Sequence, residues 1–190
     1  MKISKLYMYF LLLFVDYTIS AQSNFSGIIE YQSTINGKKL DEYISEKRKN
    51  IKDKKLISSL DKVYFYTKPI NSKLIFSEGK GLFTVEDKLS VDIHDLGQRI
   101  LKTSTGGSKE YFYDDKSKIY LIKDCESVDE CFIYENAFLK WDLTQESKEI
   151  NGFLSYKATR SEGKVIAWYS PNIPIGFGPK GEYGLPGLIL

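Results

Sequence analysis

The single histidine, His94, lies in the segment 91–97 between two acids, Asp92 and Asp95. A histidine beside a carboxylate could act as a general base that the acid orients, or could contribute to a weak metal site. A zinc site needs further histidine or cysteine ligands at suitable spacing, and one imidazole does not supply them. The pattern therefore favours a solvated histidine in a polar loop. A hydrolase that uses His94 with Asp92 or Asp95 is the alternative.

Acidic residues gather at two expected turns, as Asp114-Asp115 and as Glu126 with Asp129 and Glu130. Both groups lack the spaced ligands and central glycine of a calcium loop, so they are interpreted as solvated turns. A glycosidase could use carboxylates that lie far apart in the sequence, but nothing singles out such a pair. Nucleophile-elbow, phosphate-loop and zinc-protease motifs are absent from the sequence. The sequence thus predicts no catalytic residue, no metal ligand and no cofactor.

The N-terminus has the arrangement of a secretory signal peptide. Lys2 and Lys5 precede an apolar run at 6–15, and the small residue Ala21 follows at the expected cleavage point. The run is much shorter than the roughly 20 residues that span a bilayer. We therefore expect residues 1–21 to be removed and the exported chain to begin at Gln22, with no membrane-spanning segment after cleavage.

The two cysteines, Cys125 and Cys131, flank a polar stretch between two expected strands. This spacing places them across the neck of a hairpin loop, where their Cβ atoms can come within disulfide range. An even cysteine count in an exported chain favours a disulfide, and a redox pair or two free thiols remain alternatives. A loop this short predicts a local stabilisation of about 2 kcal/mol.

Composition points to one globular domain at 22–190. The chain has 190 residues, of which 42% are apolar and 14% aromatic, which is enough for a hydrophobic core. Lys and Arg number 27 against 25 Asp and Glu, so the net charge is +2. This lacks the basic excess of a nucleic-acid-binding protein.

Period-two alternation predicts a mainly β fold, a curled antiparallel sheet or open barrel of about ten short strands. The expected strands lie at 26–35, 62–67, 74–76, 82–85, 111–113, 119–122, 132–134, 141–144, 153–159 and 165–169. At most one short helix is expected, within 38–60, where a polar connection is the alternative. Residues 102–108 are predicted to form a flexible loop.

Tyrosines recur on the expected strands, namely Tyr64, Tyr66, Tyr111, Tyr113 and Tyr120. They could line an amphipathic cavity or an interface, although tyrosine is also common in strands for packing reasons alone.

The C-terminal segment 171–190 is rich in proline and glycine, which indicates a conformationally specified loop. Trp168 and Ile166 share a strand face, and Gly184 and Gly187 should permit turns that bring Leu185 and Leu188 onto one core. Such a segment is either a plug that closes the sheet or a recognition surface.

Residues 141–190 contain an ordered set of motifs: Lys157, Ala158, Thr159, Ala167, Trp168, Tyr169, Ile173, Pro174, Gly178, Pro179, Gly184, Leu185, Pro186, Gly187, Leu188 and Ile189. By these motifs the segment resembles the GLPGLI family of exported proteins from Bacteroidetes-type bacteria. The resemblance implies export and a β-rich fold, and the family has no established activity. Ser155 stands where the family pattern has a cysteine. The family continues past the motif, so we also expect the last strands to be missing here.

These observations predict a non-catalytic periplasmic or cell-surface protein that binds a partner or serves as a scaffold. The expected partner is an envelope protein, a peptide or an apolar ligand, and not a nucleic acid. The alternative is the exported hydrolase that uses His94 or dispersed carboxylates.

Overall fold

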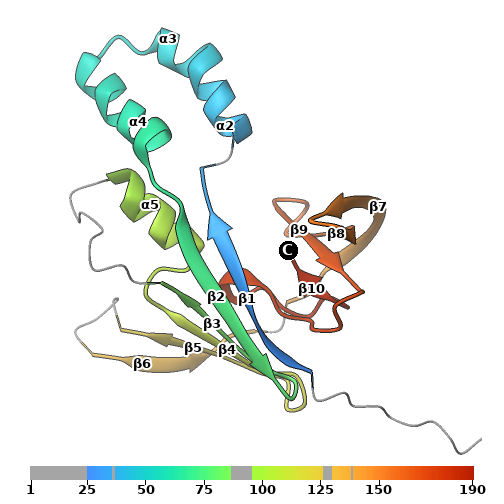
Figure 1. Ribbon diagram of the computed structural model, residues 1–190. Coiled ribbons are helices and arrows are strands. Elements are labelled where there is room, and N and C mark those ends of the chain that lie inside the picture. The colour runs from blue at the N-terminus through green and yellow to red at the C-terminus, as the bar shows by residue number, and fades with distance from the viewer. Residues whose placement is uncertain (1–24, 36, 87–95, 126–129, 138) are drawn as a thin grey trace, which may run out of the picture.

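The computed structural model describes residues 25–35, 37–86, 96–125, 130–137 and 139–190 (Figure 1). The expected signal peptide, 1–21, lies outside the described residues. So do three of the residues considered for chemistry, Asp92, His94 and Asp95.

The described strands form two antiparallel sheets, neither of them closed, which confirms the mainly β prediction of about ten short strands. Sheet A is a six-stranded meander in the order of the chain (Figure 1). Its strands are β1 (Ser26–Ser33), β2 (Ile70–Ser77), β3 (Lys80–Val85), β4 (Glu110–Asp114), β5 (Ile119–Asp124) and β6 (Phe132–Glu135). Sheet B has the order β10-β9-β8-β7. Its strands are β7 (Asp142–Ile150), β8 (Phe153–Arg160), β9 (Val165–Ser170) and β10 (Leu188–Ile189).

Two-residue turns set the register of two of the hairpins. Glu78 and Gly79 join β2 to β3, and Asn151 and Gly152 join β7 to β8. All four residues have positive φ, between 50° and 81°. This conformation matches the twist of paired strands, and glycine and asparagine adopt it at low cost. The strands on either side therefore pair directly, without a long loop.

A helical arm is inserted between β1 and β2 and projects from one end of sheet A (Figure 1). It contains α2 (Gly37–Glu42), the π-helical turn η1 (Tyr43–Lys47), α3 (Arg48–Asn50) and α4 (Lys54–Tyr66). The rings of Tyr43 and Tyr64 stack at 4.3 Å, and Arg48 binds the Asp61 carboxylate through two hydrogen bonds of 2.9 and 3.0 Å. The arm thus has its own small set of packing contacts.

The prediction of a strand at 62–67, with Tyr64 and Tyr66 on it, was wrong, because these residues continue α4. Asp53 caps that helix, since its side chain accepts hydrogen bonds from the next turn's backbone. Once the helix has begun, Tyr64 gains the stacking partner Tyr43, and this tertiary contact overrides the β propensity of the segment. Pro69 then disfavours helical backbone at the residue before it, and α4 ends at Tyr66.

A further helix, α5 (Leu96–Thr105), corrects two other expectations, a single short helix and a loop at 102–108. Leu101 and Thr105 are buried on the same side of α5. Gln98 fixes the helix to the end of α4, because its side chain both accepts from the Lys68 N–H and donates to the Lys68 carbonyl. Local sequence patterns do not predict such contacts between distant segments.

The core lies between the inner face of sheet A and the C-terminal segment. One cluster joins side chains of sheet A to Ile175, Phe177, Tyr183 and Leu188. A second cluster joins β8 and β9 to Leu185 and Ile189. The C-terminal segment therefore contributes to both clusters and links the sheets. In the described residues no helix is both long and apolar enough to cross a membrane.

Candidate functional site

Apolar side chains form a continuous row on the face of sheet A that points away from the core. We call this set the outer row: Ile28, Ile75, Leu82, Phe112 and Leu121. Each member is the direct partner of the next across successive strand pairs from β1 to β5. Ile28 is 64% exposed and Ile75 41% exposed, and the other three are partly exposed. The row is thus accessible in the described structure, although apolar surface is favourably removed from water.

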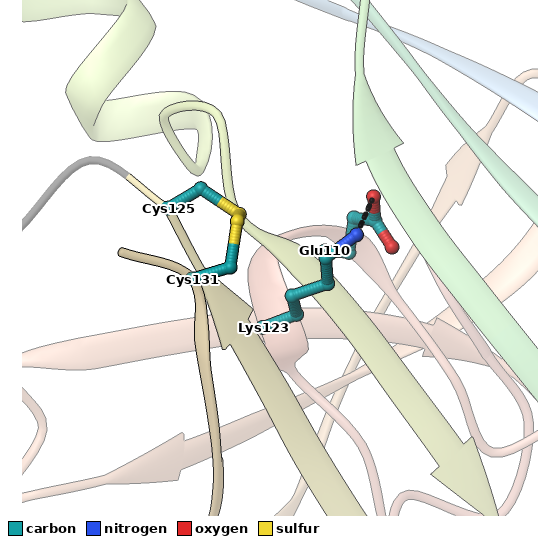
Figure 2. The surroundings of a disulfide bond; sticks show 4 residues. All are labelled: Glu110, Lys123, Cys125 and Cys131. Atoms are coloured by element: carbon teal, nitrogen blue, oxygen red, sulfur yellow. Dashed lines mark hydrogen bonds and ion pairs between the residues drawn. A yellow bond between two sulfur atoms is a disulfide. The ribbon is translucent and has the colours of Figure 1, made fainter. Parts of the chain in front are cut away.

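A row of four charged side chains and one threonine runs alongside the outer row, two residues away on each strand. We call it the charged row: Glu30, Lys73, Thr84, Glu110 and Lys123, again direct partners from β1 to β5. Lys123 and Glu110 form an ion pair of 3.2 Å (Figure 2). Lys80 and Asp114 border the opposite side of the outer row. An apolar stripe with charged borders is typical of a binding surface.

The inner face of sheet A is filled by the chain's own C-terminal aromatic residues. Phe177 stacks on Tyr113 at 5.0 Å, and Tyr183 packs edge-on against Tyr120 at 4.8 Å. Gly81 leaves room for Phe177, because a Cβ at this position would lie only 2.8 Å from its ring. Of the five tyrosines considered as cavity lining, Tyr111, Tyr113 and Tyr120 are therefore core residues, whereas Tyr64 and Tyr66 lie on α4.

Two tyrosines of sheet A, Tyr31 and Tyr113, donate hydrogen bonds to the C-terminal segment. Burial raises the pKa of Tyr31, Tyr113 and Tyr120 above the ordinary tyrosine range, so their hydroxyls stay protonated at neutral pH. Tyr31 donates to the carbonyl oxygen of Ile189 at 2.9 Å, and Tyr113 donates to that of Gly178 at 3.4 Å. Both bonds hold the C-terminal segment against sheet A.

The C-terminal segment packs as a plug between the two sheets, the first of the two interpretations given above. Its signature residues divide by exposure. Ala158, Ala167, Tyr169, Gly178, Leu185, Gly187, Leu188 and Ile189 are buried, Lys157, Thr159, Trp168, Ile173 and Pro179 are half-buried, and Pro174, Gly184 and Pro186 are exposed. Most of the signature is therefore explained by packing.

One detail of the expected signature geometry needs correction, and a second, the shared face of Ile166 and Trp168, is confirmed. Leu185 and Leu188 enter different clusters, because the turn at Gly187 sends their side chains in different directions. Trp168 lies on the outward face of β9, where the Lys148 ammonium sits 4.1 Å from its ring centroid. The buried face of β9 carries the smaller Ala167 instead, together with Tyr169.

Cys125 and Cys131 form the predicted disulfide (Figure 2), with 4.1 Å between their Cα atoms. Cys125 directly follows β5, and Cys131 immediately precedes β6. The neighbouring Asp124 is 1% exposed and pairs with the Lys109 ammonium at 2.7 Å. The hydrogen bond that the Lys109 ammonium donates to this carboxylate raises the pKa of Lys109. The bridge and the ion pair together fix the end of β5.

The two carboxylates of the first expected turn, Asp114 and Asp115, make contacts within that turn, and Glu130 of the second expected turn is exposed. Asp114 accepts hydrogen bonds from the backbone of Lys116 and Ser117, and Asp115 pairs with Lys118 at 2.7 Å. Among the residues that the structure describes, no group of three or more histidine, cysteine or acidic side chains could hold a metal ion.

Two further acids from the second expected turn, Glu126 and Asp129, lie outside the described residues, as does His94. The hydrolase alternative that uses His94 with Asp92 or Asp95 therefore concerns residues outside the described part of the chain and stays a prediction.

Sequence reasoning missed the outer row, although a signal for it was present. Tyr111-Phe112-Tyr113 and Leu82-Phe83 are apolar runs without alternation, which indicates strands with apolar side chains on both faces. The alignment of Leu82 with Phe112 depends on the register between strands, which single segments do not reveal.

Comparison with known proteins gives one similarity, at the C-terminal end. No curated protein matches the chain. No solved structure matches it either. Residues 159–190, which include β9, the plug and β10, match the model of a family described as a protein of unknown function (Porph_ging).

Proposed function

We propose that this chain is an exported, non-catalytic protein of the bacterial periplasm or cell surface that acts by binding through the outer row. One observation carries the proposal: five apolar side chains are aligned across five strands on the face of sheet A that lacks the core. A sheet face that needs only solvation would carry polar side chains at these positions.

The assignment to an exported protein rests on the sequence. The N-terminal apolar run after Lys2 and Lys5 has the form of a signal peptide, and a disulfide is typical of an oxidising compartment. The GLPGLI resemblance of residues 141–190 supports the same compartment and implies no activity.

The proposal can be tested by site-specific photo-crosslinking in the native cell envelope. A photoreactive phenylalanine analogue at position 75 or 112 of the outer row should yield defined cross-linked products. The same analogue at position 166 is the control, because Ile166 is 56% exposed on the outward face of sheet B. Products from position 166 but none from positions 75 and 112 would refute the assignment of the binding face.

A further inference from the structure

We infer that the outer row binds the outer row of a second copy of this chain, so that the protein forms a symmetric dimer through sheet A. This inference rests on the proposed function, since it names the partner of the same surface. The order of charges beside the outer row favours a second copy as this partner.

The order of charges in the charged row is complementary to its own reverse. Where the row carries a negative charge, the reversed row carries a positive one, and the opposite also holds. From β1 to β5 it carries Glu30, Lys73, Thr84, Glu110 and Lys123, that is, negative, positive, neutral, negative and positive. The neutral residue lies on β3, the central strand of the five. Reversing the order places every negative side chain opposite a positive one.

A two-fold axis roughly parallel to β3 produces this reversal when two copies pack face to face. Glu30 then meets Lys123 of the second copy, and Lys73 meets Glu110 of the second copy. Thr84 meets its own counterpart on the axis. Each pair occurs twice, as isologous symmetry requires, so four charge pairs of opposite sign flank the interface.

The same axis also places the outer row of one copy opposite the outer row of the other. Leu82 meets Leu82 of the second copy at the centre, Ile75 meets Phe112, and Ile28 meets Leu121. Sheets that pack face to face with nearly aligned strands lie about 10 Å apart, with interdigitating side chains, and these residues are large enough to fill that space.

One like-charged contact falls on the axis at the other border of the outer row. Lys80 would face its own counterpart there. Lys80 is exposed beside the Glu78-Gly79 turn and is the cross-strand partner of Asp114, whose pKa it helps to lower. The nearby carboxylate offsets this repulsion, and the long side chain can turn toward solvent.

The size of the face sets the expected affinity. Five strands spaced about 4.8 Å apart span about 19 Å, and six residues of strand extend about 20 Å, which gives roughly 400 Å² in projection on each copy. The two faces together give roughly 800 Å², which is below the roughly 1,000 Å² of a stable interface, so a weak, reversible dimer is expected. Sedimentation equilibrium of the purified protein should therefore cover concentrations from about 1 to 500 μM.

A four-fold charge exchange tests the pairing without disturbing the pairs inside one chain. The variant carries Glu30→Lys, Lys73→Glu, Glu110→Lys and Lys123→Glu. Within one chain, positions 30 and 73 therefore still carry opposite charges, and so do positions 110 and 123. The wild type and the variant should each form homodimers. A mixture of differently labelled chains should form almost no mixed dimer, because all four interchain pairs would then be alike in charge.

Leu82→Lys tests the apolar centre, and Ile166→Lys is its control on sheet B. Leu82→Lys should weaken the dimer at least about 30-fold, while Ile166→Lys should leave it unchanged. Circular dichroism verifies that each variant is folded. If Leu82→Lys does not fold, Ile75→Lys at the more exposed position 75 replaces it with the same expectation.

A wild type that stays monomeric at 500 μM overturns the inference. Free mixing of wild type and charge-exchanged chains overturns it as well. Crosslinks from positions 75 and 112 to a different molecule, combined with a monomer in solution, would leave the proposed binding face intact and eliminate only the second copy as its partner.

Discussion

Tyr31 on the first strand donates a hydrogen bond of 2.9 Å to the carbonyl oxygen of Ile189 on the last strand. The bond connects sheet A to sheet B across almost the entire chain. From the other side, the Trp141 indole N–H donates to the carbonyl oxygen of Tyr183 at 2.9 Å. Tyr31 lies on β1 of sheet A, and Trp141 directly precedes β7 of sheet B. The position of the C-terminal segment therefore depends on a side chain from each sheet's first strand or from the residue before it.

Tyr31→Phe should lower the free energy of unfolding by about 1–3 kcal/mol, because the Ile189 carbonyl loses its side-chain donor in a half-buried site. Urea unfolding followed by circular dichroism measures the change. Tyr66→Phe is the control, since Tyr66 is 71% exposed. Equal unfolding midpoints for the two variants would contradict a role for the Tyr31 hydroxyl.

Gly178→Ala should destabilise the protein by about 1–3 kcal/mol through overpacking. A Cβ at this position would clash with the Ile189 side chain, because it would lie closer to that side chain than van der Waals contact allows, and both residues are buried. The φ of Gly178 is extended, so the effect is steric only. Gly37→Ala is the matched control, because no atom lies within 4 Å of its Cβ position. Thermal melts should give a lower melting temperature for Gly178→Ala than for Gly37→Ala. Similar melting temperatures would refute the close packing of Gly178 against Ile189.

The alternation of apolar and polar residues predicted most of the strands, because it depends only on neighbouring residues within each strand. The hairpin of β4 and β5 is an example, since Tyr111, Tyr113 and Tyr120 all point to the core at the expected spacing. The disulfide was predictable for a similar reason, as Cys125 and Cys131 lie at the ends of paired strands.

What could not be predicted depends on contacts between distant segments. Tyr64 is helical because it stacks on Tyr43, and α5 is positioned by Gln98 at the backbone of Lys68. To predict the outer row, one would need to know the register of β3 against β4, because this register aligns Leu82 with Phe112. Local patterns carry no information about such pairings.

Replacing both cysteines by serine should cost about 2 kcal/mol, because the disulfide closes a short loop and restricts the unfolded chain only slightly. The melting temperature of the double variant, Cys125→Ser with Cys131→Ser, should match that of the reduced wild type. Mass spectrometry of unreduced protein after alkylation verifies the bridge. Two alkylated thiols in the folded wild type would contradict it.

The protein should lose stability at alkaline pH, above about 10, because of its buried tyrosines. The folded-state pKa of Tyr113 is raised by burial, as are those of Tyr31 and Tyr120, while the unfolded-state pKa is about 10. A raised folded pKa gives stability that is complete below the unfolded pKa and is lost as pH rises toward the folded pKa. The buried tyrosinates should therefore form only as the protein unfolds.

Tyrosinate absorbance and far-UV circular dichroism, recorded together from pH 9 to 13, measure this coupling. Tyr113→Phe removes one of the buried groups, and its free energy of unfolding should fall less steeply with pH than that of the wild type. Full ionisation of every tyrosine in the exported chain with unchanged circular dichroism would show that the core hydroxyls are accessible to hydroxide in the folded state. The tight packing of Tyr113 between Phe177 and Tyr120 argues against that outcome, since their rings stack on it at 5.0 and 5.3 Å.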